Sequence, residues 1–383
     1  MRRFVPVAVT VLAVAATLIA GPADAHQSGM RRVEAALRAT VRAGVPGVLA
    51  RVDEPGRHWT RTAGMADVDT RRPVSVHSRF RIASLTKSFV AVLVLQLVAE
   101  HRLALDRPVG DWLPHIIPDA ESVTVRQLLD HTSGLADYMA APGFQDPRQY
   151  AQRHHTPEQL IRAGVALGPV AEPGARFSYA NTNYIVLGRL VERVTGQDLG
   201  TQLRDRILGP LGLDHTSLPV DDHTLPDPHA TGYVALDPAH PDMLTAMTEL
   251  DPSFEWAAFG MVSDGRDVNR FYQALFGGRL VPPAMLNQMR TGHPTGQAPV
   301  FPQYGLGLES VGLTCGQMWG ATGQTVGYQT LSFTDPTGTR TITVSLDVER
   351  TSPDDPDTGQ LILAAVNVVN EYLCGTAYQL PTG

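Results

Sequence analysis

A serine stands three residues before the only lysine of the chain, at the start of a long apolar segment. The segment reads SFVAVLVLQLVAEHRLAL over residues 88–105 and contains no Gly or Pro. Apolar residues on most faces predict a mostly buried helix. Ser84 then falls at or near the first turn, and the three-residue spacing places its hydroxyl on the same face as the Lys87 amine. The partial positive charge of a helix N-terminus favours a serine alkoxide and the oxyanion formed after attack.

The lysine itself indicates a chemical requirement. The chain has 31 basic residues, and all except Lys87 are arginine. Arginine stays charged, whereas a buried lysine amine can become neutral and accept a proton. A desolvated lysine can therefore activate a serine nucleophile without a histidine. The alternatives are a surface lysine kept by chance at position 87 and a helix cap at Ser84.

A second polar pair precedes another apolar periodic stretch, at Tyr184 to Val194. Tyr179 and Asn181 lie two residues apart in the sequence YAN. In extended or turn backbone, side chains two apart project the same way. We expect the ammonium of Lys87 to lower the pKa of the Tyr179 phenol, which would then share in proton transfer. Asn181 would hydrogen-bond a substrate carbonyl and the lysine together, and helix capping is its alternative role.

The N-terminus has the features of a secretory signal. Residues 1–25 begin MRR, continue through an apolar run and end GPADA, which predicts cleavage before His26 and a secreted protein. A membrane anchor is the alternative, but the apolar run is shorter than the roughly 20 residues that span a bilayer. In an exported protein, Cys315 and Cys374 favour a disulfide over a metal site or a reactive thiol.

The charge and composition exclude several classes of partner. The net charge is −7, and no basic run or basic amphipathic helix is present, so neither nucleic acid nor a lipid surface is an expected partner. The histidines and aspartates at 140–157 and 219–253 match no metal-ligand spacing, and no metal or cofactor is predicted. Both stretches are rich in Pro and Asp and are predicted to be loops that shape substrate choice.

Several motifs together resemble those of a known family. They are SLTK, LLDHTSGL at 128–135, YAN at 179–181, and ATG followed by GY at 321–328. With DRPVGDWLP, YGLGL and the two cysteines, they resemble the penicillin-recognising serine hydrolases, the serine β-lactamase and D-alanyl-D-alanine carboxypeptidase family. Within it, the chain looks most like the secreted actinobacterial D-alanyl-D-alanine carboxypeptidases. The resemblance runs from about residue 30 to residue 374.

The resemblance implies a role for each matching residue. Ser84 would be the acylated nucleophile, while Lys87 and Tyr179 would move protons. Asn181 would orient the substrate amide. The other expected site residues are Thr322 and Gly323 on a strand that pairs with substrate, Gln324 as an oxyanion-hole N–H beside that of Ser84, and Trp256 as an aromatic wall of the cleft.

The sequence departs from the carboxypeptidase pattern at two positions. Ala321 stands where the third motif has His or Lys, and the rival placement GHPTG, with His293, lacks the following Gly-Tyr. Glu309 follows YGLGL, where carboxypeptidases of this type have an arginine that grips the substrate carboxylate. A carboxylate there would repel D-Ala-D-Ala, unless Glu309 points to solvent.

The order of the predicted elements indicates an α/β (α+β) fold of the β-lactamase and transpeptidase type. A helix at 28–43, strands GVLARV and HWTRTAG, a hairpin at 329–348 with DPTG as its turn, and a helix at 361–373 would form an antiparallel sheet flanked by the N- and C-terminal helices. A mostly helical subdomain would occupy about 85–230. We predict one catalytic domain over 26–383, with the site where the two parts meet.

The functional prediction is a secreted hydrolase that forms an acyl-enzyme on Ser84 and acts as a D-alanyl-D-alanine carboxypeptidase-like peptidase or amidase. The expected partner is a small peptide, ester or lactam substrate, and the expected state is a monomer. The alternatives are an esterase or β-lactamase-like hydrolase of a substrate without a free carboxylate, and a catalytically weak binder of penicillin or peptidoglycan peptide.

Overall fold

A nine-stranded antiparallel sheet forms the centre of the computed structural model, which describes residues 22–118, 120–237, 240, 242–350 and 356–380. The strand order is β3-β2-β1-β13-β12-β11-β10-β9-β8, so the N- and C-terminal parts of the chain meet where β1 pairs with β13. The strands are β1 (Gly47–Glu54), β2 (Arg57–Asp67), β3 (Arg72–Pro73), β8 (His293–Gln297), β9 (Phe301–Tyr304), β10 (Glu309–Leu313), β11 (Gly316–Thr325), β12 (Tyr328–Thr334) and β13 (Thr341–Leu346).

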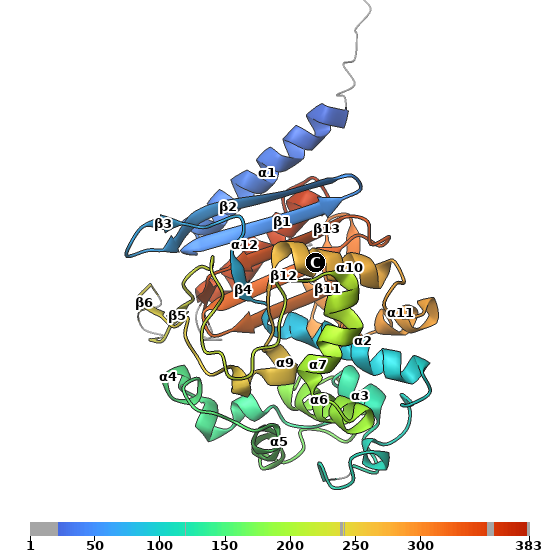
Figure 1. The fold of residues 1–383 in the computed structure, drawn as a ribbon. Helices are drawn as coiled ribbons and strands as arrows, with labels where there is room; N and C mark the ends of the chain where they lie inside the picture. Colours follow the sequence, from blue (N-terminus) through green and yellow to red (C-terminus); the bar gives the residue numbers. More distant parts are fainter. Residues whose placement is uncertain (1–21, 119, 238–239, 241, 351–355, 381–383) are drawn as a thin grey trace, which may run out of the picture.

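Helices cover both faces of the sheet. The terminal helices α1 (Pro22–Arg42) and α12 (Pro356–Leu373) contact each other and pack against one face, and α10 (Gly265–Phe276) packs against the other (Figure 1). Every residue of β13 is buried as a result. The predicted fold class is confirmed, and the predicted hairpin is present as β12 and β13, with Asp335 bonding the turn backbone at Thr339.

The predicted N-terminal helix begins earlier than residue 28, at Pro22. Most of the predicted signal, residues 1–21, lies outside the described residues. The predicted cleavage position before His26 falls within α1, and cleavage stays a prediction.

Most of the remaining helices belong to a second part of the molecule, between Thr86 and Met289, which packs on the α10 side of the sheet. They are α2 (Thr86–Ala99), α3 (Val125–Leu129), α4 (Pro147–Tyr150), α5 (Pro157–Val165), α6 (Asn181–Thr195), α7 (Leu199–Leu203), α8 (Gly209–Leu211), α9 (Trp256–Phe259) and α11 (Pro283–Met289). Thr124 and Thr156 begin α3 and α5 with capping boxes, and Gly196, in a left-handed conformation, ends α6.

Helix α2 is the apolar segment that follows the Ser-x-x-Lys pair. Its residues from Thr86 to Leu95 are all buried, so it is covered on every face, as the lack of amphipathic periodicity predicts. It contacts both α6 and α9. The turn that precedes it, Ala83–Leu85, contacts β11 and β12 of the central sheet.

The two predicted loops contain regular structure. The stretch 219–253 contributes β5 (Tyr233–Ala235) and β6 (Leu244–Ala246), which form a three-stranded sheet with β14 (Val348–Glu349), and 140–157 contains α4. The loop prediction was wrong there because the Pro and Asp residues flank these elements. Asp146, for example, caps α4. A two-stranded sheet pairs β4 (Arg79–Arg81) with β7 (Val262–Asp264).

The predicted disulfide is present. Cys315 lies in the turn between β10 and β11, and Cys374 lies directly after α12. Their Cα atoms are 5.4 Å apart. The bond therefore links the C-terminal helix to the hairpin that carries the ATG motif.

Candidate active site

Ser84 lies in a single 3₁₀ turn, Ala83–Leu85, that leads directly into α2. The preceding residue, Ala83, has φ 49°, a left-handed conformation that is unfavourable for a residue with a Cβ. This backbone is held by burial, because Ile82, Ala83 and Leu85 are all fully buried. Ser84 itself lines a pocket that Tyr179 and Asn181 also line.

Lys87 contacts three oxygen atoms one turn further along. Its Nζ lies 2.9 Å from Ser84 Oγ, 2.8 Å from Asn181 Oδ1 and 2.9 Å from the Ala258 carbonyl oxygen. The last two oxygens carry no proton and can only accept a hydrogen bond. In the neutral amine, the lone pair must therefore face the Ser84 hydroxyl, which is the one partner with a proton to give.

The surroundings of Lys87 bring its pKa into the working range of a base. Burial lowers the pKa of Lys87 to about 7. The negative charges of Asp137 and Glu309 act in the opposite direction and raise it. A substantial fraction of the amine is neutral near pH 7. The structure thus provides the proton acceptor that the sequence analysis expects at this position.

Tyr179 donates a hydrogen bond to Ser84 Oγ over 2.9 Å. The expectation that Lys87 lowers the pKa of this phenol was wrong. Burial of the hydroxyl raises the pKa of Tyr179 far above its usual value, although 38% of the side chain is exposed toward the pocket. Tyr179 is therefore neutral and donates its hydroxyl proton in this hydrogen bond.

Asn181 is held on both sides by charged groups. Its Oδ1 accepts from Lys87, and its Nδ2 donates to Asp137 Oδ2 over 2.9 Å. One N–H of the amide is left for a substrate carbonyl, as the sequence analysis expects. Asp137 was missed from the sequence, and the signal that points to it is its position as the cap of the short helix Tyr138–Ala140.

His131 is a second residue that the sequence analysis left without a role. It is fully buried, and its ring stacks on Tyr179 with the ring centroids 4.3 Å apart. The Nδ1 atom accepts from the Ala180 N–H over 3.2 Å, so the proton is on Nε2. Burial holds the pKa of His131 well below its usual value. A neutral ring thus positions Tyr179.

Strand β11 runs beside Ser84 and presents a partly free edge. Its register with β10 ends at Gly320, whereas its pairing with β12 continues to Thr325. The Thr322 N–H points away from β12, since it donates to Glu309 Oε2. Alternate residues of a strand direct their N–H groups to the same edge, so the Gln324 N–H points into the pocket.

Gly323 allows this edge to approach the nucleophile. A Cβ at this position would lie 2.7 Å from Ser84 N and 2.6 Å from the Ile82 carbonyl oxygen. Only a glycine fits so close an approach. The N–H groups of Ser84 and Gln324 are therefore neighbours, which is the arrangement that an oxyanion hole requires.

The packing around β11 shows where the side chains lie at both positions that depart from the family pattern. Ala321 is 6% exposed and belongs to the apolar core. Glu309 does not point to solvent, because its Oε2 accepts from the Thr322 N–H over 3.1 Å and from the Thr322 hydroxyl over 2.6 Å. The rival motif is on β8, where His293 is exposed and faces Asp130 instead of Ser84.

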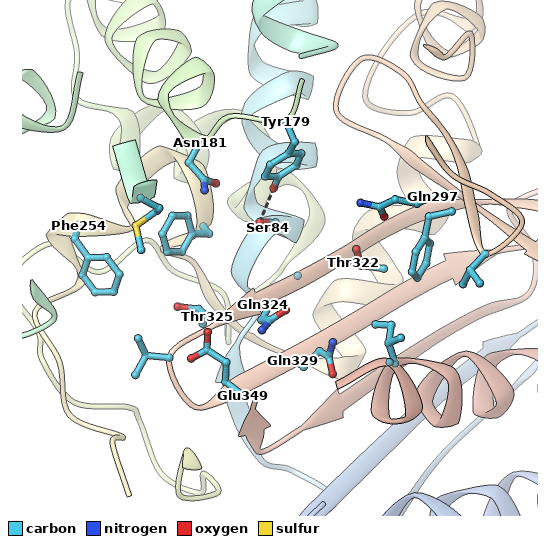
Figure 2. Close-up of a pocket in the computed structure, with 18 of the residues that line it drawn as sticks. Ser84, Tyr179, Asn181, Phe254, Gln297, Thr322, Gln324, Thr325, Gln329 and Glu349 are labelled. Carbon is cyan, nitrogen blue, oxygen red and sulfur yellow. Dashed lines mark hydrogen bonds between the residues drawn. The ribbon is translucent and has the colours of Figure 1, made fainter. Parts of the chain in front are cut away.

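The pocket has a volume of about 620 Å³. Figure 2 shows Ser84 and Tyr179 at its centre, with Asn181 and Thr322 on opposite sides. Its lining includes these four residues together with Met139, Tyr150, Phe254, Phe259, Gln297, Val300, Phe301, Gly323, Gln324, Thr325, Val326, Gln329, Glu349, Gly359 and Ile362. Among these residues, none is Lys, Arg or His.

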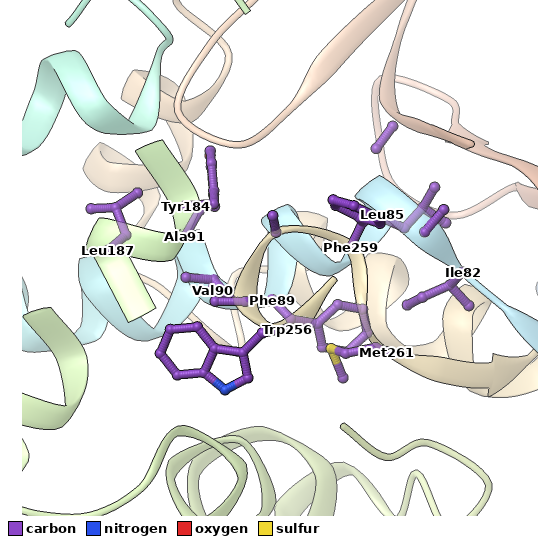
Figure 3. Close-up of a cluster of buried hydrophobic side chains, with 14 of the residues drawn as sticks. Ile82, Leu85, Phe89, Val90, Ala91, Tyr184, Leu187, Trp256, Phe259 and Met261 are labelled. Carbon is purple, nitrogen blue, oxygen red and sulfur yellow. The ribbon is translucent and has the colours of Figure 1, made fainter. Parts of the chain in front are cut away.

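The prediction for Trp256 was wrong. Its side chain is 8% exposed and lies in the apolar core beside Phe89 and Val90 (Figure 3), in contact with Gly188 of α6, and it does not line the pocket. The aromatic wall comes from Phe254 and Phe259 instead. Trp256 starts the one-turn helix α9, and this turn directs its neighbours toward the cleft and Trp256 itself inward.

In the described part of the chain, no three His, Cys, Asp or Glu side chains are grouped so that they could hold a metal ion, and no helix is long and apolar enough to cross a membrane.

Comparison with known proteins assigns the chain to a family. The Beta-lactamase family model matches residues 30–367, and the chain belongs to this family. The family, together with relatives such as an amidohydrolase, defines the class of protein: a serine hydrolase. A D-stereospecific amidohydrolase from Streptomyces sp. is similar in structure, with a TM-score of 0.81 and 35% identity over 91% of this chain and 99% of that protein.

Curated relatives match over a shorter part. Penicillin-binding protein 4 of Amycolatopsis lactamdurans is 36% identical over 47% of this chain and 46% of its own length. Esterase EstB of Burkholderia gladioli is 36% identical over 40% of this chain and 42% of its own length. The matched part thus spans less than half the length of these curated relatives.

Proposed function

We propose that the protein hydrolyses an amide, peptide or ester bond through an acyl-enzyme on Ser84. The observation that carries the proposal is the contact of Ser84 Oγ with two groups of opposite roles, the Lys87 amine at 2.9 Å and the Tyr179 hydroxyl at 2.9 Å. One accepts the serine proton and the other donates a proton. Together they supply general base and general acid at one oxygen atom.

The reaction would proceed in two halves. Ser84 Oγ attacks the substrate carbonyl carbon while its proton passes to neutral Lys87, and the resulting oxyanion is bound by the N–H groups of Ser84 and Gln324. The bond to the leaving group breaks as that group receives a proton by way of Tyr179, which regains one from the Lys87 ammonium. Water then attacks the ester on Ser84, with the same groups moving its proton, and the free acid leaves.

The substrate that fits best has no free carboxylate on its leaving group. The Glu309 carboxyl occupies the N–H and hydroxyl of Thr322, which would otherwise be available to an anion. Among the described residues lining the pocket, none is basic. We therefore infer that an amide or ester is hydrolysed in preference to D-Ala-D-Ala, in agreement with a D-stereospecific amidohydrolase and an esterase as relatives.

The proposal also includes where the enzyme acts, outside the cell. The predicted signal at residues 1–25 and the Cys315–Cys374 disulfide both fit a secreted enzyme. The substrate would then be a small extracellular peptide, ester or lactam. A monomer would suffice for catalysis, since the described residues of one chain supply every group of the proposed mechanism.

The test is intact-mass detection of an acyl adduct on the wild type and on Ser84→Ala. The panel pairs diacetyl-Lys-D-Ala-D-Ala with its C-terminal amide and with the matching thioester, and includes D-phenylalanine amide, which has a free amino group, and a penicillin. We expect adducts that depend on Ser84 and an amide turned over at least about tenfold faster than the free carboxylate, since the latter loses a charge-assisted contact.

Two outcomes contradict parts of the proposal. Release of D-alanine from the free carboxylate as fast as from the amide would refute the role given to Glu309. A stable adduct with penicillin and no turnover of any substrate would favour a catalytically silent binder instead of a hydrolase.

A further inference from the structure

The pocket has two unlike halves on either side of Ser84. In Figure 2, Phe254 and Glu349 lie on one side of the serine, and Gln297 lies on the other. Phe254 and Glu349 are buried, whereas Gln297 is exposed. We refer to the part lined by Tyr150, Phe254, Phe259 and Glu349 as the enclosed half, and to the part near Gln297 as the open half.

The order of events in an acyl-enzyme reaction indicates which half of the pocket holds the acyl group and which holds the leaving group. The leaving group departs first and is replaced by water, while the acyl group stays attached to Ser84 until the second step. The open half offers the exit and the entry for water. The acyl group therefore occupies the enclosed half, beside Glu349.

Glu349 is the acidic residue of this half, and its charge is not balanced there. It is 7% exposed, and no ion pair to a basic side chain is found for it in the described part of the chain. The Glu255 carboxyl, by contrast, does have a basic partner, because Arg81 Nη1 lies 3.7 Å from it. Burial raises the pKa of Glu349 to about 7, against a hydrogen bond from the Gly327 N–H that lowers it.

Aromatic residues line the same part of the pocket as this carboxyl. Tyr150 and Phe254 have ring centroids 5.0 Å apart, and Phe254 and Phe259 have centroids 5.8 Å apart. A carboxylate within a wall of aromatic rings is the chemistry that recognises an organic ammonium group, through charge pairing and cation–π contact. A neutral or anionic acyl group would leave the buried carboxylate with its hydrogen bonds from Gly327 and Gln324 but without an opposite charge, which is unfavourable.

We propose that Glu349 and the surrounding aromatic wall form a subsite for a protonated amine on the acyl part of the substrate. The proposal rests on the acyl-enzyme function above and narrows its substrate class. The preferred substrates are amides, peptides or esters of an amino acid with a free amino group. N-acylated substrates are then poor, because they present a neutral amide to Glu349.

The test separates binding from catalysis. In Ser84→Ala, calorimetry compares D-phenylalanine amide with N-acetyl-D-phenylalanine amide at about pH 7.5, close to the usual pKa of an α-amino group. We expect the free amine to bind at least about tenfold tighter, the scale of one charge-assisted contact. In Ser84→Ala with Glu349→Gln, the two ligands bind to within about twofold of each other, because the anionic partner of the amine is gone.

A matched control removes a carboxylate elsewhere. Glu158→Gln in α5 breaks an exposed ion pair with Arg189 and keeps the preference for the free amine. Equal binding of the two ligands to Ser84→Ala overturns the subsite, and this comparison needs no Glu349 variant to fold. A preference that survives Glu349→Gln overturns the assignment to Glu349.

The failure of this inference is distinguishable from that of the proposed function. If the amine preference is found but the amide never acylates Ser84 in the wild type, the subsite stands and the hydrolase proposal is wrong. If Ser84 is acylated with no preference for the amine, the hydrolase stands and the subsite is wrong.

Discussion

Lys87 shows why arginine cannot replace lysine at this position. Burial removes the amine from water and lowers its pKa to about 7, and because two of its three contacts can only accept, Ser84 is the one contact that can give the neutral amine a proton. A guanidinium would keep its charge under the same burial. The residue that the chain uses once is thus the one whose chemistry depends on losing a proton.

A pH profile and one substitution test this role. The neutral fraction of Lys87 rises through a pKa of about 7. The rate of Ser84 acylation, measured by stopped-flow with a chromogenic ester, is therefore expected to rise about tenfold from pH 6 to pH 8. Lys87→Arg lowers the rate by at least about a hundredfold across this range, because it supplies no neutral base.

The pH profile of Ser84 acylation in Glu309→Gln is compared with that of the wild type. The negative charge of Glu309 raises the pKa of Lys87, so its removal moves the midpoint to lower pH. Normal acylation by Lys87→Arg would make Lys87 an electrostatic spectator. A midpoint that stays in place in Glu309→Gln would assign the titration to another group.

At the scale of elements, the proposed mechanism depends on the approach of β11 to the turn Ala83–Leu85. The strand is held by β12 on one edge, and Gly323 brings the other edge within contact of the nucleophile. Ala321 belongs to the same strand but contributes to the core. A histidine there would overpack a filled space, so we expect Ala321→His to leave the acylation rate no higher than that of the wild type.

Gly323→Ala tests the approach of the two elements. The added Cβ must push β11 away from Ser84 N and the Ile82 carbonyl, since it would lie 2.7 Å and 2.6 Å from them. We expect at least about a hundredfold slower acylation, the usual effect of losing an oxyanion-hole donor. Overpacking also lowers the free energy of unfolding by about 1–3 kcal/mol.

The matched control is Gly143→Ala, because nothing lies within 4 Å of a Cβ at that position. Urea denaturation and acylation rates are measured for both variants. Acylation of Gly323→Ala at the wild-type rate would show that β11 does not supply the oxyanion hole.

At the scale of the whole molecule, the two ends of the chain are joined around one sheet. α1 packs on α12, β1 pairs with β13, and the disulfide ties the end of α12 to the β10–β11 hairpin. The nucleophile comes from the helical part, and β11 comes from the sheet. The site therefore depends on the docking of the two parts against each other.

The disulfide is expected to stabilise this arrangement. It closes a loop with a sequence separation of 59 residues, and on the chain-entropy model its removal costs about 4 kcal/mol. Urea denaturation of Cys315→Ser with Cys374→Ser measures the loss, and a reductant should destabilise the wild type alone. An unchanged midpoint would mean that the unfolded chain gains no freedom from its removal.

Much of the fold was predictable because its signals are local. The buried helix after Ser84, the strands of β1 and β2 and the β12–β13 hairpin follow from periodicity and turn residues over short stretches. Elements framed by Pro and Asp, such as β5, were missed because turn residues on both sides hide a three-residue strand. Trp256 was misplaced because one turn of helix decides whether a side chain faces the core or the cleft.

The sequence by itself determined the pairing of Ser84 with Lys87, since their three-residue spacing at the turn that leads into α2 brings the two side chains together whatever surrounds them. The tertiary structure decided how that pair is tuned and what it accepts. Asn181 hydrogen-bonds both Asp137 and Lys87, which lie far from it in the chain, and Glu309 contacts Thr322 between the paired strands β10 and β11. Charges and cavities depend on such packing, and no local pattern encodes it.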